Sequence, residues 1–344
     1  MAEQPKGVQM PDQAPLSWTV LQTLAPTHLA LYRSSRFMGD TLSVALHDFV
    51  GADRQILQRV YQTLGQLLDV LAAAKDARVG GPTIEESLQQ IEWGGAVRSM
   101  QQFGKATITD HSSPQLNAVI HDLRGGSFLA LSVTLQLLTR GQVQPNQLLQ
   151  AFFLARDHLK MMRNAVPDLD RPQYERDRAQ KAHRVQLLVE KWSQATYQLD
   201  SHRAVVVVDA KFDGNVSERC IEFAALDRVL YNLLNNAVRH AADQHVYLTI
   251  FQVDEHNVRF VVYNRMTAEQ SAVLRERFGD NLGSLFEGGF TTGGTGLGLR
   301  ICAEFVADAY GVHGLQRCLA EGYIGARNVH DYFVTWFHWP VAAD

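Results

Sequence analysis

A glycine-rich stretch near the C-terminus constrains the fold of this chain more than any other feature. Residues 293–298 contain four glycines, and an apolar run over about 299–310 follows them directly and predicts a helix. Glycine lets the backbone adopt positive φ and approach a ligand closely. A helix that opens from such a loop presents free N–H groups and its positive end to the ligand. The stretch therefore predicts a backbone cradle for an anion such as phosphate.

Upstream of this stretch, residues 227–240 predict a helix with an unusual polar face. Asn232, Asn236 and Arg239 lie on or beside one face at helical spacing, and Asn235 adds a third asparagine. Asparagine is a poor helix former, so three of them in so short a run exceed what a plain amphipathic helix requires. A carboxamide oxygen suits Mg²⁺, which bridges phosphates, and an arginine can meet a phosphate oxygen. Alone, these residues are consistent with a solvated helix face; with the glycine-rich stretch they favour a nucleotide site.

Helices and strands mix over residues 183–344, which predicts an α+β sandwich with helices against a mixed sheet. Alternating and β-branched runs predict the strands, and amphipathic runs predict the helices. The predicted strands cover residues 204–208, 246–253, 258–263 and 332–339, and the predicted helices cover about 185–197, 223–241 and 299–310.

The first part of the chain is expected to be helical. A polar tail of about 15 residues precedes a helical texture over 18–104, in which apolar residues recur at three- and four-residue steps from Ile56 to Leu71. No catalytic motif stands in residues 1–108, which we interpret as a helical input or dimerisation module.

Residues 109–170 predict a helical hairpin. Helices of about 114–140 and 147–166 flank a short polar loop. One hairpin buries little apolar surface, whereas two copies form a four-helix bundle. We therefore expect a homodimer through this segment.

The composition excludes several classes of protein. Hydrophobic residues make up 46% and charged residues 20%, as in ordinary globular proteins. Against 32 Lys and Arg stand 36 Asp and Glu, a net charge of −4 that argues against a nucleic-acid-binding surface. No apolar run reaches the roughly 20 residues of a membrane span, and the N-terminus lacks a signal pattern. The three cysteines are odd in number and far apart, which excludes a disulfide framework and fits a cytoplasmic protein.

His121, followed by Asp122, Leu123 and Arg124, is a candidate nucleophile on the first helix of the hairpin. At about 100° per residue, the histidine falls at the flank of the apolar stripe, where a ring nitrogen stays in water. A neutral imidazole is a nucleophile near pH 7, and Asp122 can orient the other ring nitrogen and take its proton. The alternative is an ordinary solvated histidine beside an aspartate. His47 also precedes an aspartate, but no matching hairpin and nucleotide motif directly follow it.

Residues from about 185 to 341 resemble the ATP-binding domain shared by histidine kinases, gyrase B, Hsp90 and MutL. NLLNNAVRH resembles the N box of that family, LFEGGF the F box, GTGLGL the second glycine box and TWFHWP the closing strand. The resemblance implies ATP and Mg²⁺ as cofactors, with Asn236 as the magnesium-binding residue. The other nucleotide-binding residues that it implies are Asn232, Arg239, Asn264, Gly294, Gly296, Leu297 and Gly298.

The tetrapeptide HDLR at His121 resembles the H box of the dimerisation and histidine-phosphotransfer domain. The order of helical module, hairpin and ATP-binding domain is similar to that of a cytoplasmic sensor histidine kinase of a two-component system. This resemblance implies that His121 is phosphorylated from ATP, and that the phosphoryl group then passes to an aspartate of a separate response-regulator receiver domain.

Two positions depart from the family pattern. The family normally carries Asp-x-Gly-x-Gly after the second hairpin strand, where this chain has Asn264 followed by Arg265, Met266, Thr267 and Ala268. Asn264 can still present a carbonyl oxygen to the adenine amino group, without the charge that makes such a bond about twice as strong. Gly125 stands where the family often has the Thr or Asn that serves dephosphorylation of the partner. With Gly126, it is expected to bend the helix beside His121.

Two rival functions remain at this stage. Loss of the first glycine box favours a degenerate kinase that binds no ATP and acts as a dimeric phosphotransfer or docking module. Retention of GTGLGL and Asn236 favours an active kinase. A Ser/Thr kinase of the anti-sigma type is disfavoured by the hairpin and by HDLR.

Overall fold

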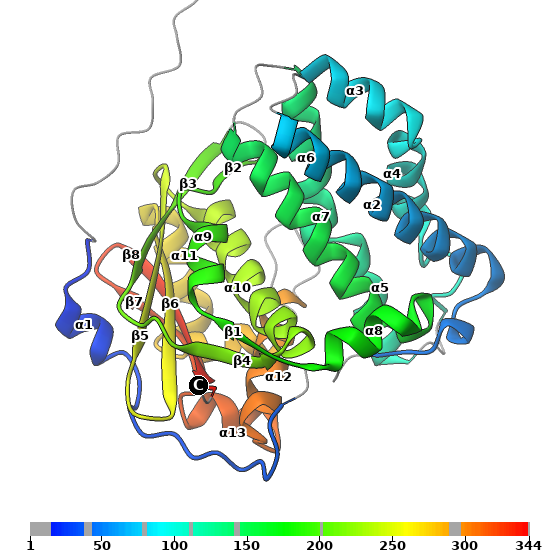
Figure 1. Cartoon of the computed structure of the whole chain (residues 1–344). Helices are drawn as coiled ribbons and strands as arrows, with labels where there is room; N and C mark the ends of the chain where they lie inside the picture. The colour runs from blue at the N-terminus through cyan, green and yellow to red at the C-terminus, as the bar shows by residue number, and fades with distance from the viewer. Residues whose placement is uncertain are drawn as a thin grey trace, which may run out of the picture. The chain divides into compact units, whose positions relative to one another are not determined.

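A computed structural model of the chain describes residues 15–37, 43–77, 81–109, 113–140, 145–199, 202–288 and 297–342. It divides into two compact units, each assembled from segments that are far apart in the sequence (Figure 1). The sheet unit comprises residues up to 37, residues 182–217 and residues 228–344, and the helical unit comprises residues 38–181 and 218–227. The predicted order, a helical region followed by a mixed α/β sheet domain, is confirmed.

The sheet unit is built on a six-stranded sheet with the strand order β2-β3-β5-β6-β8-β7. Strands β3 and β5 are parallel, and every other neighbouring pair in this sheet is antiparallel. The strands are β2 (Thr196–Leu199), β3 (His202–Ala210), β5 (His245–Gln252), β6 (Asn257–Arg265), β7 (Ile324–Val329) and β8 (Tyr332–Pro340). Two short strands, β1 (Gln180–Arg184) and β4 (Asn215–Arg219), form a separate two-stranded sheet.

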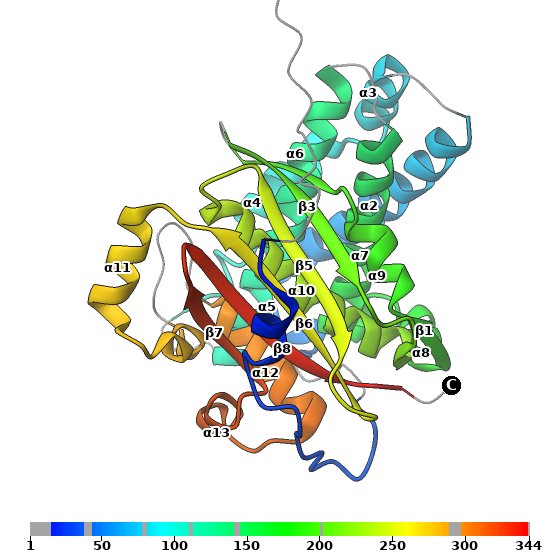
Figure 2. The ribbon, with the colours of Figure 1, turned by 90° about the vertical axis from the view of Figure 1, so that its left-hand side faces the viewer.

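Helices pack on one face of the large sheet. They include α9 (Gln186–Trp192), α10 (Cys220–His240) and α12 (Gly298–Tyr310), and Figure 2 shows α10 and α12 behind the strands. Phe260 of β6 stacks on Phe337 of β8, with ring centroids 4.8 Å apart. Because side chains alternate along a strand, Phe260, Val262 and Asn264 all point to this helical face. Three more elements, α11 (Ala268–Phe278), η3 (Leu282–Glu287) and α13 (Leu315–Ala320), complete the unit.

The opposite face of the sheet is covered by the N-terminal segment, residues 15–37, which we call the N-terminal belt. Its short helix α1 (Trp18–Gln22) lies across the strands in Figure 2. Leu16, Leu21 and Leu24 of the belt are buried in one apolar cluster with aromatic and aliphatic side chains of the sheet. The sheet residues of that cluster are Tyr247, Phe251, Val261, Tyr263, Val334 and Trp336.

Arg259 of β6 fixes the belt to this face. Its side chain is fully buried, and its Nε donates to Nε2 of His338 at 2.8 Å. Its two terminal nitrogens donate to four belt carbonyls at 2.7–3.0 Å, those of Leu21, Gln22, Ala25 and Pro26. A charged donor that satisfies so many carbonyls fixes the backbone of the belt as well as its side chains.

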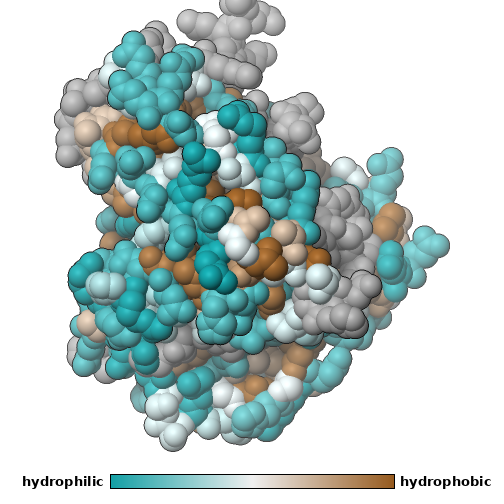
Figure 3. Space-filling model, turned by 90° about the vertical axis from the view of Figure 1, so that its right-hand side faces the viewer, coloured by the Kyte–Doolittle hydropathy of each residue, from teal (hydrophilic) through white to brown (hydrophobic). Residues whose placement is uncertain are grey.

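The helical unit contains one long helix, α2 (Gly51–Ala77), which packs on α7 (Pro145–Ala165) and α4 (Trp93–Gln102). The apolar stripe predicted from Ile56 to Leu71 is confirmed, since Leu57, Val60, Leu64, Leu67 and Leu71 are all fully buried. The remaining elements are η1 (Leu46–Asp48), α3 (Gly81–Gln90), α5 (Pro114–Arg124), α6 (Gly126–Arg140), η2 (Pro167–Leu169) and α8 (Arg171–Arg178). On the side shown in Figure 3, hydrophilic side chains surround separate apolar patches.

Three expectations about helices need correction. The helical texture predicted over 18–104 does not hold in the described residues between 23 and 45, where belt backbone groups bond to the sheet unit instead. The helix predicted over 185–197 ends at Trp192, because Gln194 takes a positive φ of 58° and the chain turns into β2. The helix predicted over 114–140 is broken at Gly125 into α5 and α6, as the two adjacent glycines suggested.

The part of the chain that the structure describes contains no helix that is both long and apolar enough to cross a membrane.

Candidate nucleotide site and phosphoacceptor

Helix α10 carries the predicted asparagine face. Its apolar residues Val229, Leu230, Leu233 and Leu234 are buried and hold the helix on the sheet. The polar residues between them are placed differently: Asn232, Asn235 and Asn236 are half-buried, and Arg239 is exposed. The carboxamides are therefore accessible on a helix that packing holds in place, as a cation or phosphate ligand requires.

The start of α12 lies against this face. A Cβ built on Gly298 would come 4.0 Å from Cγ of Asn232, so the first residue of α12 is in van der Waals range of the asparagine. Leu297, the preceding residue, is half-buried. The end of the glycine-rich stretch and the N-box helix are thus neighbours in space, as the nucleotide-site prediction requires. Gly294 and Gly296 lie outside the described residues.

Cys302 of α12 also contacts α10 close to Asn232. Its thiol is fully buried one turn into α12, and it donates to the carbonyl of Val229 at 3.7 Å. Burial raises its pKa to about 12, against the opposing effect of a hydrogen bond with Asn232. The thiol is therefore neutral and is no nucleophile; it helps to hold Asn232. This contact was not predicted, although Cys302 stands one helical turn after Gly298 and so on the same face.

Arg228 lies one turn before Asn232 on α10. Burial lowers its pKa to about 10, so the guanidinium remains charged at neutral pH. It stacks over the ring of Phe305 on α12, with 5.0 Å from Cζ to the ring centroid. This cation–π contact is a second connection between α10 and α12.

Asn264 lies at the end of β6, opposite Val246 of β5 and Phe333 of β8. Its side chain is fully buried on the helical face of the sheet. The Nδ2 group donates to the carbonyl of Arg265 at 3.0 Å, whereas Oδ1 has no hydrogen-bond partner among the described residues. A buried acceptor without a donor destabilises the protein by about 1–3 kcal/mol unless a ligand supplies one. The carbonyl oxygen has the chemistry to accept from an amino group such as that of adenine.

Beyond Asn264 the chain differs from the family pattern in structure as well as in sequence. Met266 is buried, and Thr267 caps helix α11, with its hydroxyl accepting from the amide of Gln270 at 3.2 Å. The Gln270 side chain in turn accepts from the amide of Thr267 at 2.9 Å, which completes a capping box. A helix start thus occupies the residues where the family carries its two glycines.

His121, the predicted phosphoacceptor, lies on α5 of the helical unit. Its neighbours Val119, Ile120 and Leu123 are buried, while its own side chain keeps 28% exposure, so it lies at the flank of the apolar stripe as predicted. Nδ1 is 3.4 Å from Oδ1 of Asp122, whose side chain is only 8% exposed. A carboxylate on Nδ1 favours a proton there and leaves Nε2 as the nucleophilic nitrogen.

The break after the H box comes within one turn of His121. The amide of Gly125 donates to the carbonyl of His121 at 3.0 Å, and Gly126 opens α6. A Cβ on Gly125 would lie 3.1 Å from that carbonyl oxygen, a close contact that glycine avoids. His47, the weaker candidate, is different: its side chain is 81% exposed and its Nε2 is 3.7 Å from Oδ1 of Asp48.

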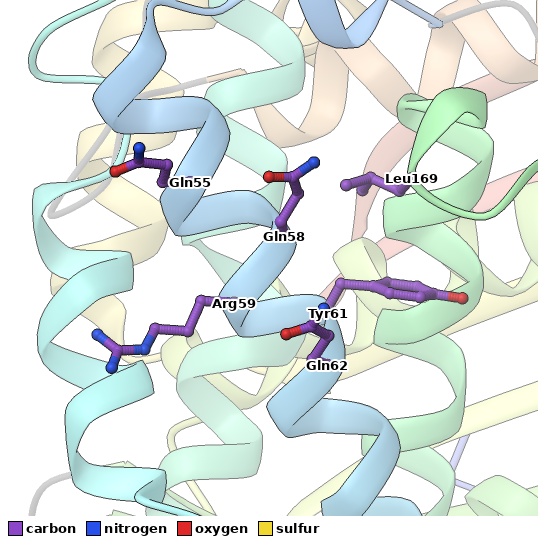
Figure 4. A pocket seen from close by; sticks show the side chains of 6 residues that line it. All are labelled: Gln55, Gln58, Arg59, Tyr61, Gln62 and Leu169. Carbon is purple, nitrogen blue, oxygen red and sulfur yellow. The ribbon is translucent and has the colours of Figure 1, made fainter.

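A concavity of about 740 Å³ on α2 is a separate feature of the helical unit (Figure 4). Gln58 points toward Leu169, whereas Gln55 and Arg59 point to the other side of the helix. The Tyr61 hydroxyl donates to Oδ2 of Asp170 at 2.8 Å, which makes it part of the packing rather than a free ligand group. The lining is polar and carries no catalytic arrangement.

Among the described residues, no three His, Cys, Asp or Glu side chains come together as a metal site.

Comparison with known proteins identifies the type of domain that holds the paired helices α10 and α12. Residues 222–331 match the model of the histidine kinase-, DNA gyrase B- and HSP90-like ATPase family. The chain therefore contains a domain of this family, whose members bind ATP. None of the curated proteins compared matches the sequence.

Among solved structures, the similar ones include histidine kinases. The mycobacterial sensor histidine kinase MprB is 15% identical, with 48% of this chain and 100% of that chain covered and a TM-score of 0.29. The histidine kinase AdeS of Acinetobacter baumannii is 18% identical, with 65% and 98% covered and a TM-score of 0.32. The catalytic domain of the histidine kinase ThkA is 21% identical, with 46% and 85% covered and a TM-score of 0.27. At these scores, the domain assignment depends on the family match and on the arrangement of its elements.

Proposed function

We propose that this protein is a cytoplasmic sensor histidine kinase that transfers the γ-phosphoryl group of ATP to Nε2 of His121. The observation that carries the proposal is the contact between Gly298 and Asn232, within a domain that matches the ATPase family. It brings the end of the glycine-rich stretch to the N-box helix. The three free thiols, at Cys220, Cys302 and Cys318, support a reducing compartment.

Each side chain of the proposed site has a defined task. Asn264 accepts a hydrogen bond from the adenine amino group through its open Oδ1. Asn236 holds Mg²⁺, which would supply charge neutralisation on the phosphates, and Asn232 and Arg239 flank it on α10. The α12 start at Leu297 and Gly298 donates backbone N–H groups to phosphate oxygens.

The acceptor chemistry belongs to His121 and Asp122. The carboxylate orients the ring through Nδ1 and accepts the proton that the ring loses as Nε2 takes the phosphoryl group. The phosphohistidine would then transfer to an aspartate of a response-regulator receiver domain in trans. A homodimer through α5, α6 and α7 is part of the same proposal, with 109–170 as the phosphotransfer hairpin and 183–344 as the kinase domain. The predicted input module, residues 1–108, loses the belt, residues 15–37, which packs on the sheet unit.

Incubation with γ-labelled ATP and Mg²⁺ tests this function. A phosphoramidate is stable to alkali and labile to acid, so the label is expected to survive base and disappear in mild acid. It should be absent from His121→Ala and Asn236→Ala and normal in His47→Ala, the matched control. Asp122→Asn should slow labelling without abolishing it, because the carboxylate orients the ring and accepts its proton but does not itself take the phosphoryl group. Labelling that persists in His121→Ala would show that the acceptor is another residue.

A second function, a non-catalytic phosphotransfer or docking protein, is favoured by the helix start at Thr267 in place of the glycine box. It predicts that the wild-type protein takes no label from ATP but accepts it at His121 from a phosphorylated receiver domain.

A further inference from the structure

Helix α12 connects the candidate nucleotide site with the N-terminal belt. Its first turn lies against Asn232 through Gly298 and Cys302. Its last turn, at the other end of this 13-residue helix, is bound by Tyr32 and Arg33 of the belt. Any axial shift of α12 therefore changes both ends together.

The belt satisfies the C-terminal carbonyls of α12. The amide of Tyr32 donates to the carbonyl of Tyr310 at 2.8 Å, and Nη1 of Arg33 donates to the carbonyl of Asp308 at 2.8 Å. The last carbonyls of a helix lack intrahelical partners and carry partial negative charge, so a guanidinium there is favourable. Gly311 ends the helix with a φ of 69°, and a Cβ at this position would collide with Arg33. The close approach of the belt therefore requires this glycine.

Separate anchors hold the belt on either side of this contact. On the N-terminal side, Arg259 binds the belt carbonyls around Pro26. On the C-terminal side, Arg36 donates to the carbonyls of Pro340 and Val341 at 2.9 and 2.8 Å. Phe37 then packs on Trp339, with ring centroids 5.9 Å apart. Between these anchors, the belt has little freedom to move relative to α12.

Phe37 also contacts α12 directly. Its ring lies 6.5 Å from that of Phe305, and Cζ of Arg33 lies 5.5 Å above it. Phe305 is the residue on which Arg228 of α10 stacks. The belt therefore meets α12 at its end and at its middle, and the second contact leads directly to the N-box helix.

We propose that the N-terminal belt is a positioning element of the nucleotide site. Through Arg33 it holds α12 at the axial position that keeps Gly298 against Asn232, which deepens the nucleotide-binding function proposed above and depends on it. Displacements of about 1 Å at such a site are enough to weaken binding of a reacting group. By linkage, bound nucleotide must in turn stabilise the belt. In the sequence, the belt is followed directly by the helical unit.

The test compares variants of the full-length protein by nucleotide affinity and by hydrogen exchange without nucleotide. Arg33→Ala should lower the affinity for ATP–Mg²⁺ about fivefold, since it removes one cation from a helix C-terminus. It should also speed exchange of amides in the first turn of α12, at the opposite end of the helix. Arg33→Lys keeps a charged donor and should recover most of both properties.

Tyr32→Ala is the matched control on the same belt. Its hydroxyl accepts from Nη2 of Arg317 at 2.7 Å, on α13 rather than α12, and its backbone amide is retained. This variant should bind ATP normally. Equal affinity in Arg33→Ala and wild type, or an equal loss in Tyr32→Ala, would overturn the proposal while leaving nucleotide binding intact. If the wild type binds no nucleotide, the proposed function fails; unchanged exchange at α12 in Arg33→Ala would then overturn the positioning role separately.

Discussion

Two buried polar residues on opposite faces of strand β6 differ in how completely their polar atoms are hydrogen-bonded. Arg259 points to the belt face, and all of its nitrogens find acceptors within the protein. Asn264 points to the helical face, and its Oδ1 finds none among the described residues. Both side chains are fully buried. The closed hydrogen-bond network of Arg259 stabilises the fold, whereas the proposed function assigns the unpaired Oδ1 of Asn264 to the adenine amino group.

The largest expected effect comes from opening the closed network. Arg259→Met keeps a long apolar side chain but leaves the belt carbonyls and Nε2 of His338 without their donor. We expect the free energy of unfolding to fall by about 3–5 kcal/mol, measured by denaturant titration of the full-length protein. The control is Arg317→Met, an exposed arginine paired with Glu321, which should change stability by less than about 1 kcal/mol. A small loss in Arg259→Met would mean that the belt is not fixed by this residue.

Protonation of His338 in acid should destabilise the same hydrogen-bond network. Burial, with Arg259 nearby, lowers the pKa of this histidine to about 3 in the folded protein, against about 6.5 when unfolded. A depressed pKa means that the unfolded chain binds the proton first, so stability is complete above pH 6.5 and is lost as the pH falls toward 3. At pH 5 the loss is about 2 kcal/mol.

The contribution of a second buried histidine, His158, to the acid dependence of stability must be removed from this measurement. Burial lowers its pKa also to about 3, in the helical unit, so it contributes a similar acid loss. The experiment therefore compares His338→Gln with its parent at pH 7 and pH 5, in a His158→Gln background. A parent as stable at pH 5 as at pH 7 would contradict the assignment of a neutral, buried His338.

The open acceptor predicts a smaller effect on binding. Asn264→Asp places a charge opposite the adenine amino group, and a hydrogen bond to a charged group contributes about 1.5–3 kcal/mol against about 1 for a neutral one. The affinity for ATP should rise by up to roughly tenfold in calorimetry. GTP, which carries a carbonyl at that position of the base, should not gain. A loss of ATP affinity would show that Asn264 does not face the base.

Much of this arrangement could be predicted from local patterns in the sequence. Alternating and β-branched runs located β5 and β6, the asparagine spacing located the polar face of α10, and the two glycines at 125 and 126 indicated the break beside His121. These signals are local, since each depends on residues within one element.

The rest depends on contacts between distant residues. Nothing in residues 15–37, most of which were expected to be helical, indicated that this segment covers a sheet face. Its backbone is held by Arg259, more than 200 positions away in the sequence. The register of β6 placed Asn264 at the end of the strand. Its unpaired oxygen could not be predicted, because this depends on how Nδ2 bonds to the carbonyl of Arg265.

The smallest effect on stability should come from removing the unpaired oxygen of Asn264 by substitution. Asn264→Leu replaces the amide by an apolar side chain of similar size, so it removes the unpaired oxygen together with one hydrogen bond. These changes oppose each other, and we expect the free energy of unfolding to change by less than about 1 kcal/mol. ATP affinity should nevertheless fall about fivefold to tenfold, because the adenine amino group loses its acceptor. A stability loss as large as that of Arg259→Met would show that Asn264 belongs to the structural network, and the distinction between the two faces of β6 would then be wrong.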